Sequence, residues 1–393
     1  MAQTALWTRK FIAIMMANGF FFVSFHSLLP TLPLYVASLG ATGTEIGIIA
    51  GIFSLSSIGI RFFTEDVVHR LGKKNCLYAG ILLSLAATIS YPFITSIPLL
   101  TIGRVIQGLG FGLGTTFAAA LAVDIIPPSR RGEGVGFFGL GNTISMGFAP
   151  AAGVALLTGY GSTALFLLAT ITPSLALIAT YATGKSNVVH HVQQAKLKLS
   201  LWHRFVEAGT GFPSFFTMLW GFAFGSTNTF IAMFANTQDI PSSGLFFVVG
   251  TVLVFLSRTF GGRLYDSKGP FYVVLPGTIA YTLFVVLVLF WVHDLTSLLI
   301  SSIFYGLGGG LIMPALMTWL FNAVQPERRS NASATFYNMM DIGTSLGIIA
   351  LGALSSYIGY AYIFFVVLAV MVCFFIAFMW QHLQGALPKP QRS

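Results

Sequence analysis

The two halves of this chain repeat each other, and this repeat limits the possible folds more than any other feature of the sequence. The matched segments lie 197 or 198 residues apart and are Arg61–Gly72 with Arg258–Gly269, Gly108–Leu113 with Gly306–Leu311, and Pro128–Arg131 with Pro326–Arg329. Three matches at nearly one offset in 393 residues indicate a duplicated unit. We therefore expect two halves of similar fold with a binding site between them.

The composition indicates that the protein lies in a membrane. Charged residues make up 8% of the chain and hydrophobic residues 55%, whereas a soluble domain carries about 25% charged residues. Apolar runs long enough to cross a bilayer, which takes about 20 residues, occur six times in each half. They lack the period-two alternation of a β-barrel, so we expect helices. The predicted spans are 11–36, 42–62, 76–95, 99–124, 134–156, 162–183, 211–235, 243–264, 271–292, 296–323, 333–356 and 359–381.

The sequence thus predicts an all-α membrane protein with 12 transmembrane helices in two homologous six-helix bundles. We place the N-terminal bundle at 1–183, a cytoplasmic linker at 184–210, and the C-terminal bundle with a short cytoplasmic tail at 211–393. Nineteen of the 20 Lys and Arg residues lie before the first span, in the even-numbered loops or after the last span. By the positive-inside rule, both termini are expected in the cytoplasm, with the spans in a cell membrane of bacterial inner or plasma type. A net charge of +9 spread over such loops favours contact with anionic lipid over nucleic acid.

The sequence lacks the motifs of an enzyme. It contains no phosphate-binding loop, nucleophile elbow, dinucleotide motif or metal-ligand spacing, so we expect no enzymatic activity, no cofactor and no metal site. Cys76 and Cys373 lie in or beside apolar runs and predict no disulfide framework. The adjacent His190 and His191 lie in the polar linker, where a solvated segment is favoured over a metal site.

Three short motifs lie in or beside the predicted spans. They are G-x-L-x-D-x-x-G at Gly262, Leu264, Asp266 and Gly269 in the second-half loop, R-x-x-Q-G at Arg104–Gly108 in the fourth span, and G-x-x-P-x-x-G at Gly147, Pro150 and Gly153 in the fifth span. Together with the duplicated halves, they resemble the major facilitator superfamily over nearly the whole chain. The fifth-span motif is similar to the signature of the proton-coupled exporters in that family. The resemblance therefore implies a 12-span secondary transporter of the drug:proton antiporter type.

The first-half copy of the loop motif departs from the family pattern. It keeps Gly72, but Glu65 stands where a glycine is expected, Asp66 at a basic or neutral position, and His69 in place of the aspartate. A carboxylate at the close-contact position weakens packing against the eleventh span. We expect the latch that this loop forms in the family to be lost or moved to Glu65 or Asp66.

Three charged or titratable residues within spans are candidates for coupling. Arg104 would cost about 2.5–3.5 kcal/mol in lipid, so it either faces a cavity and binds substrate or braces its half. Asp341, in the eleventh span, can take up a proton near neutral pH because burial disfavours its charged form, or it pairs with a loop arginine. His26, in the first span, titrates in the right range but is equally suited to a structural hydrogen bond. Asp124 ends the fourth span beside Arg131, where a structural ion pair is expected.

Aromatic and amide side chains in the spans predict a cavity for an amphiphilic substrate. The candidates are Asn18, Phe22, Gln107, Phe111, Asn142, Trp220, Asn228, Phe304, Tyr305 and Asn338. We expect a monomeric secondary transporter that exports a drug or a secreted metabolite such as a metallophore, driven by protons through alternating access. A lipid or glycolipid flippase on the same fold and an importer of a sugar or organic anion are the alternatives.

Overall fold

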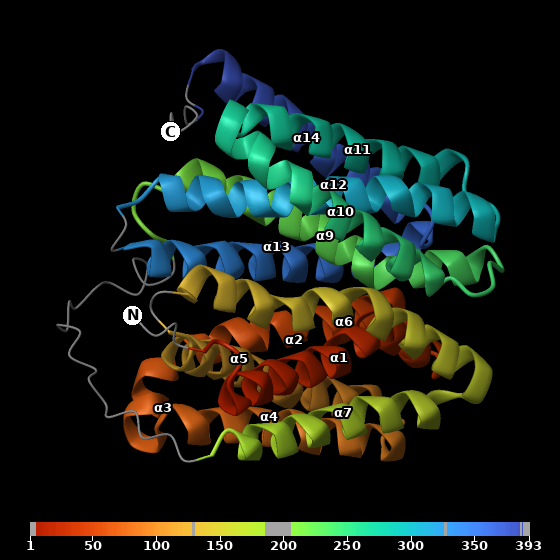
Figure 1. Cartoon of the computed structure of the whole chain (residues 1–393). Coiled ribbons are helices and arrows are strands. Elements are labelled where there is room, and N and C mark those ends of the chain that lie inside the picture. The colour runs from red at the N-terminus through yellow and green to blue at the C-terminus, as the bar shows by residue number, and fades with distance from the viewer. Residues whose placement is uncertain (1–4, 128–129, 185–205, 326–327, 386, 388–393) are drawn as a thin grey trace. The chain divides into compact units, whose positions relative to one another are not determined.

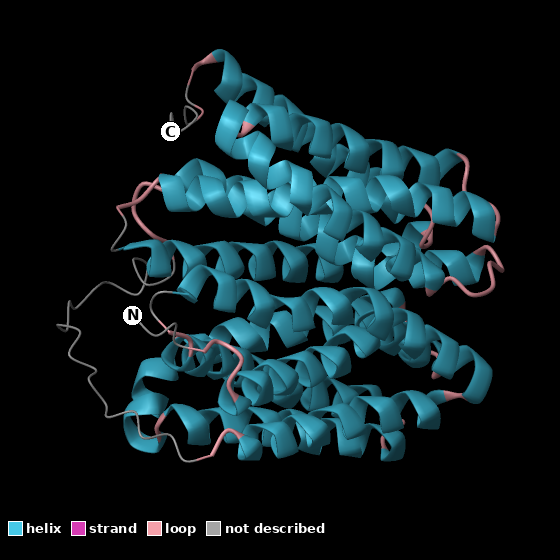
Figure 2. Ribbon diagram, in the orientation of Figure 1, coloured by secondary structure: helices cyan, strands magenta, loops and turns pink. Residues whose placement is uncertain are grey.

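The structure, a computed structural model, describes residues 5–127, 130–184, 206–325, 328–385 and 387. Every secondary-structure element in these ranges is helical (Figure 2), so the predicted all-α class is confirmed. The helices of the first half are α1 (Arg9–Ser38), α2 (Gly43–Arg61), α3 (Thr64–Leu71), α4 (Lys73–Ser90), the 3-10 turn η1 (Tyr91–Phe93), α5 (Ile97–Ile125), α6 (Arg131–Tyr160) and α7 (Ser162–Ala182). Those of the second half are α9 (Gly211–Thr237), α10 (Leu245–Lys268), α11 (Phe271–Phe290), α12 (Leu295–Asn322), α13 (Arg329–Ile358) and α14 (Ile363–Leu383) (Figure 1).

Among the described helices, 11 are long and apolar enough to cross a membrane. The predicted span that is missing from this set is α9, which has 27 residues but more polar side chains. Every residue of α9 from Ala223 to Ala235 is buried. A helix enclosed by protein can carry Asn, Ser and Thr, because neighbouring helices and its own backbone satisfy their hydrogen bonds. The low hydropathy of α9 therefore reflects its central position in its bundle.

The sequence repeat is reproduced in the helices and in the turns between them. The pairs α4 and α11, α5 and α12, and α6 and α13 each begin 198 residues apart. Gly72 (φ 77°) and Gly269 (φ 90°) end α3 and α10 in the left-handed region. Gly161 (φ 84°) and Gly359 (φ 81°) end α6 and α13 in the same way. Glycine adopts this conformation without a steric penalty, so both halves turn at corresponding positions.

The first half departs from this symmetry at its altered loop motif. α2 ends at Arg61 and a separate helix, α3, begins at Thr64, whereas α10 continues through the corresponding residues to Lys268. The Thr64 hydroxyl donates a hydrogen bond to the Arg61 carbonyl oxygen at 2.8 Å, which satisfies an acceptor at the end of α2. A short helix packed against α4 thus occupies the segment that the sequence predicted to be a loop.

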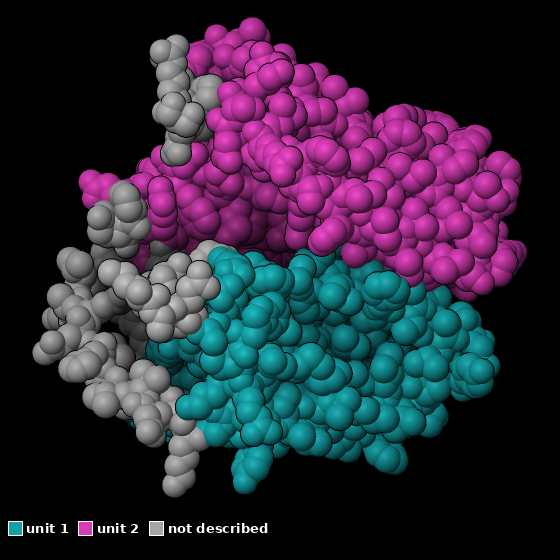
Figure 3. Space-filling view, viewed as in Figure 1, with its two compact units in different colours: residues 1–31, 52–198 teal, residues 32–51, 199–393 magenta. Residues whose placement is uncertain are grey.

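The chain forms two compact units, coloured teal and magenta in Figure 3. Unit 1 comprises residues 1–31 and 52–198, and unit 2 comprises residues 32–51 and 199–393. The segment 32–51 packs closely on α13 within unit 2, since a Cβ atom at Gly47 would lie 2.9 Å from the Gly352 Cα atom. Residues 185–205 lie outside the described residues. The predicted boundaries of the two bundles, at residues 183 and 211, lie on either side of this segment and remain predictions.

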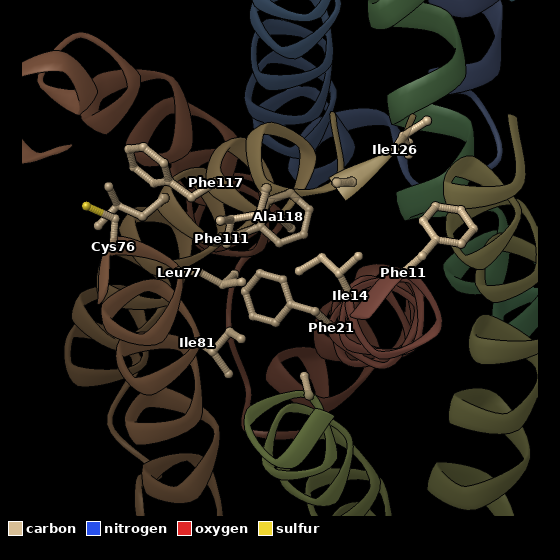
Figure 4. Packing of buried hydrophobic residues seen from close by; sticks show 14 of the residues in the cluster. Phe11, Ile14, Phe21, Cys76, Leu77, Ile81, Phe111, Phe117, Ala118 and Ile126 are labelled. Carbon is tan, nitrogen blue, oxygen red and sulfur yellow. The ribbon is translucent and has the colours of Figure 1, made fainter. Parts of the chain in front are cut away.

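The core of unit 1 is an apolar cluster to which α1, α4 and α5 contribute (Figure 4). The Phe21 ring of α1 stacks on the Phe111 ring of α5 with centroids 5.6 Å apart, and Leu77 of α4 is fully enclosed. A Cβ atom at Gly110 of α5 would lie 2.6 Å from the Gly80 carbonyl oxygen of α4. Small residues thus let these two helices meet backbone to backbone, which fixes the position of α5 and its polar side chains.

Candidate functional site

Two of the predicted site residues, His26 and Asn142, form a hydrogen bond in unit 1. Nε2 of His26 on α1 lies 2.9 Å from Oδ1 of Asn142 on α6. His26 is 8% exposed, and its ring lies 5.8 Å from the Phe22 ring and 4.8 Å from the Phe25 ring. Because an amide oxygen accepts, this contact places the imidazole proton on Nε2 and leaves Nδ1 with its lone pair. The contact therefore links α1 to α6 through a titratable side chain.

Arg104 and Gln107, both on α5, form a second polar group in unit 1. Arg104 is 1% exposed, and its Nη1 donates to Gln107 Oε1 at 2.7 Å. The hydroxyl of Tyr91 in η1 donates to the same oxygen at 2.8 Å. The guanidinium lies 4.4 Å from the centroid of the Phe53 ring on α2, a cation–π contact. These contacts hold the arginine against α2 and η1.

Three phenylalanine rings connect the two polar groups, and we call Phe25, Phe53 and Phe111 the unit 1 aromatic cluster. The Phe25 centroid lies 5.0 Å from that of Phe53 and 4.5 Å from that of Phe111. Phe25 contacts His26 at one end of the cluster, and Phe53 contacts Arg104 at the other. Two of the three candidate coupling residues thus border one aromatic surface.

Trp220, Asn228 and Tyr305, three of the predicted cavity residues, come together in unit 2. The Tyr305 hydroxyl on α12 donates to Asn228 Oδ1 on α9 at 3.0 Å. The Phe224 ring stacks on both Tyr305 and Trp220, with centroid distances of 5.5 and 5.2 Å. Trp220 is fully buried, and its indole N–H has no hydrogen-bond acceptor among the described residues. All four side chains are buried, so the cluster packs the interior of unit 2.

The remaining candidates for the cavity and for coupling are spread over α1, α12 and α13. Asn18 is buried on α1, and Phe304 is half-buried on α12. Asn338 is buried and Asp341 half-buried on α13, three residues apart. Asp341 therefore belongs to unit 2, whereas the other two coupling candidates belong to unit 1.

The fifth-span glycine motif lies in α6, which continues as a helix through Pro150. Gly147 and Pro150 are buried. A Cβ atom at Gly153 would lie 2.6 Å from the Ser27 carbonyl oxygen of α1. The last glycine of the motif thus brings the backbones of α6 and α1 together beside His26.

Asp124 forms an ion pair, and its partner is a lysine on another helix. Nζ of Lys73, the first residue of α4, lies 2.6 Å from Asp124 Oδ2 at the end of α5. Arg130 instead binds both carboxylate oxygens of Glu133, at 2.8 and 2.7 Å. The side chain of Arg131 lies outside the described residues. The sequence neighbours of Asp124 were the expected partners, but the close packing of α4 on α5 brings Lys73 to it.

The residues of the two loop motifs lie in α3, in the last two turns of α10 and in the turns that follow these helices. Those that are exposed are Asp66, His69, Asp266 and Gly262, and the side chain of Glu65 lies outside the described residues. A Cβ atom at Gly262 would meet open space, whereas one at the neighbouring Gly261 would lie 2.9 Å from the Leu311 side chain. Gly72 and Gly269 form the turns described above.

Sequence reasoning missed two charged residues. Arg258 was counted with a loop, but it lies within α10, and its Nη2 is 3.7 Å from the Met313 sulfur of α12. Arg258 falls inside the predicted span 243–264, which could have indicated a buried arginine, but it was counted with the basic residues of the following loop. Glu207 lies before α9 and is 3% exposed, with Arg328 2.7 Å away. No local pattern marked Glu207, because it lies in a polar connection.

Comparisons with known proteins agree with this architecture. The sequence matches the family model described as Major Facilitator Superfamily over residues 14–292 and 269–393. It is 22% identical over 379 residues to the staphylopine export protein of Staphylococcus aureus, covering 92% of each chain. It is also 22% identical to the quinolone resistance protein NorA of Staphylococcus aureus, covering 85% of this chain and 86% of the relative. The crystal structure of the nucleoside transporter NupG has the same fold, with a TM-score of 0.75 at 16% identity over 95% of this chain and 98% of that one. The chain therefore belongs to the Major Facilitator Superfamily and is a membrane transporter of a small molecule rather than an enzyme.

Proposed function

We propose that this transporter exports a small amphiphilic molecule, a drug or a secreted metabolite such as a metallophore, in exchange for protons by alternating access. The observation that carries the proposal is the packing of the fifth-span motif, in which Gly153 brings α6 against α1 beside the His26–Asn142 pair. A motif similar to an exporter signature thus lies next to a titratable group. The names of two relatives, a staphylopine export protein and a quinolone resistance protein, support the direction of transport.

His26 and Asp341 are the proposed proton carriers. Protonation of His26 at Nδ1 would add positive charge beside the unit 1 aromatic cluster, whose ring faces attract cations. A cationic amphiphile and a proton would then disfavour each other at this surface. Thermodynamic linkage requires that substrate binding change the proton affinity of the carrier in return.

Transport of ethidium, a planar aromatic cation, into liposomes that contain the purified protein tests the proposal. Proton-driven exchange predicts that an imposed pH gradient accelerates transport and that a protonophore abolishes the effect. Equal rates with and without the gradient would refute proton coupling. A thermal-shift screen with quinolones, metallophores, sugars and lipids identifies further ligands, because binding to the folded state raises stability by RT ln(1 + [L]/Kd). Stabilisation by lipids alone would favour the flippase alternative.

Two substitutions separate the proposed carriers. If Asp341 carries the proton, Asp341→Asn loses the dependence of transport on the pH gradient while it still binds ethidium. If that variant keeps the dependence and His26→Gln loses it, His26 is the carrier. Arg104→Ala serves as the comparison: it loses ethidium binding if Arg104 contacts substrate, and it only lowers the melting temperature if Arg104 is a brace.

A further inference from the structure

Glu207 is the one carboxylate that is buried among the residues that the structure describes, with 3% of its surface exposed. It lies four residues before α9, at the end of the connection between the halves. A buried carboxylate is costly unless charged or polar partners compensate it. Its partners therefore show what this position does.

Three partners of Glu207 lie on one face at the start of α13. Arg328 Nη1 lies 2.7 Å from Glu207 Oε1, an ion pair by distance whose angles are not those of a hydrogen bond. The Asn331 amide donates to Glu207 Oε2 at 3.2 Å. The backbone N–H of Glu207 donates to the Thr335 hydroxyl at 2.9 Å. Residues 328, 331 and 335 recur at helical spacing, so they form one stripe that binds both the side chain and the backbone of Glu207.

The first half arranges the same charges differently. At the offset of 198 residues, Arg328 and Asn331 correspond to Arg130 and Glu133, and Glu207 corresponds to Arg9. In the first half, Arg130 pairs with Glu133 three residues later on its own helix. In the second half an amide replaces that carboxylate, and the carboxylate comes from the chain that enters α9. The arginine thus pairs with a nearby residue in the first half, whereas in the second half it pairs with a residue of a different segment.

We propose that Glu207 is a positioning residue that docks the chain entering α9 onto the first two turns of α13. If the only role of Glu207 were to neutralise Arg328, a carboxylate three residues after Arg328 would be enough, as Glu133 is for Arg130 in the first half. The added contacts from Asn331 and to Thr335 fix where the entering chain lies. Since α13 carries Asp341, the tether sets the start of the helix on which a proposed proton carrier lies, a consequence that rests on the proposed function.

Relocating the carboxylate distinguishes a tether from simple charge neutralisation. Glu207→Ala removes the tether, and Asn331→Glu in the same chain gives Arg328 the local partner that Arg130 has in the first half. Spin labels at Phe212→Cys on α9 and Ala334→Cys on α13, both exposed, report the distance between the two helices. The labels are placed in a Cys373→Ala background, because Cys373 is exposed. Glu133→Gln, which breaks the first-half pair, is the matched control.

A tether predicts that Glu207→Ala broadens the distance distribution and lowers the melting temperature by at least about 3 °C. It also predicts that adding Asn331→Glu does not restore the distribution and that Glu133→Gln leaves it unchanged. Glu207→Gln, which keeps the shape, should show a smaller broadening and serves if Glu207→Ala does not fold. A distribution unchanged by either Glu207 variant, or restored by Asn331→Glu, would overturn the proposal. The distance measurement needs no substrate, so a failure of ethidium transport counts against the proposed function alone.

Discussion

The close approach of Gly153, in the exporter-like motif, to α1 gives a quantitative test of the structure. In Gly153→Ala, the new Cβ atom would lie 2.6 Å from the Ser27 carbonyl oxygen and 3.2 Å from the Thr31 methyl carbon. Carbon–oxygen contacts in proteins lie at about 3.3–3.6 Å, so α6 would have to move from α1 by roughly 0.7 Å. Overpacking of this kind costs about 1–3 kcal/mol. One kcal/mol shifts the melting temperature of a unit of this size by about 2–4 °C, so we expect a decrease of about 2–12 °C.

Gly139→Ala is the matched control on the same helix. Gly139 is exposed and has open space at its Cβ position. Alanine is favoured over glycine in a helix by up to about 1 kcal/mol, so this variant should keep or slightly raise the melting temperature. The assay is thermal unfolding of the purified protein in detergent. Equal melting temperatures for the two variants would refute the backbone contact between α6 and α1.

Three further predictions test other parts of the structure. Tyr305→Phe leaves the buried Asn228 oxygen without its hydrogen-bond donor. This loss costs about 1–3 kcal/mol, so the melting temperature of the variant should fall. Tyr357→Phe, at an 85% exposed position, should leave the melting temperature unchanged. Hydrogen bonds from the Ser297 hydroxyl and backbone N–H hold the pKa of Asp294, at the start of α12, below its usual value of 3.8. This helix cap therefore stabilises the folded protein above pH 3.8, and its contribution is lost as the pH falls through the folded-state pKa. The melting temperatures of wild type and Asp294→Ala should therefore differ at about pH 6 and converge as the pH falls below 3.8. A gap that widens at low pH would contradict the assignment. The topology is tested with single cysteines in the Cys373→Ala background. A cysteine at position 242 (Ser242→Cys) should be labelled from outside intact cells, and one at position 200 (Ser200→Cys) should not. The reverse labelling pattern would refute cytoplasmic termini.

Several contacts of the candidate site could be anticipated only in part from the sequence. His26 and Asn142 were both candidates, yet nothing in the sequence joined residues 116 positions apart. Asp124 was expected to form an ion pair, but the partner depends on how α4 packs on α5. The motif also did not indicate that Gly261, rather than its neighbour Gly262, packs against Leu311. Whether Arg104, His26 and Asp341 act in coupling remains a prediction.

The sequence by itself determined the membrane setting, the helical class and the duplication. Apolar runs of the right length have few options in lipid, since every backbone N–H and C=O must be paired within the segment. The repeat fixed corresponding turns, because Gly72 and Gly269 occupy backbone conformations that favour glycine. These properties depend on residues close together in the chain, so they are visible without a structure.

Only the tertiary structure decided which polar groups meet. Glu207 looked like an ordinary linker residue and became buried because α13 supplies Arg328, Asn331 and Thr335 along one face. Likewise, α9 has the polarity of a weak membrane span, and burial by its neighbours makes that polarity acceptable. Such pairings depend on helix crossings set by small residues spread over the chain, and local sequence patterns do not record which helices will cross.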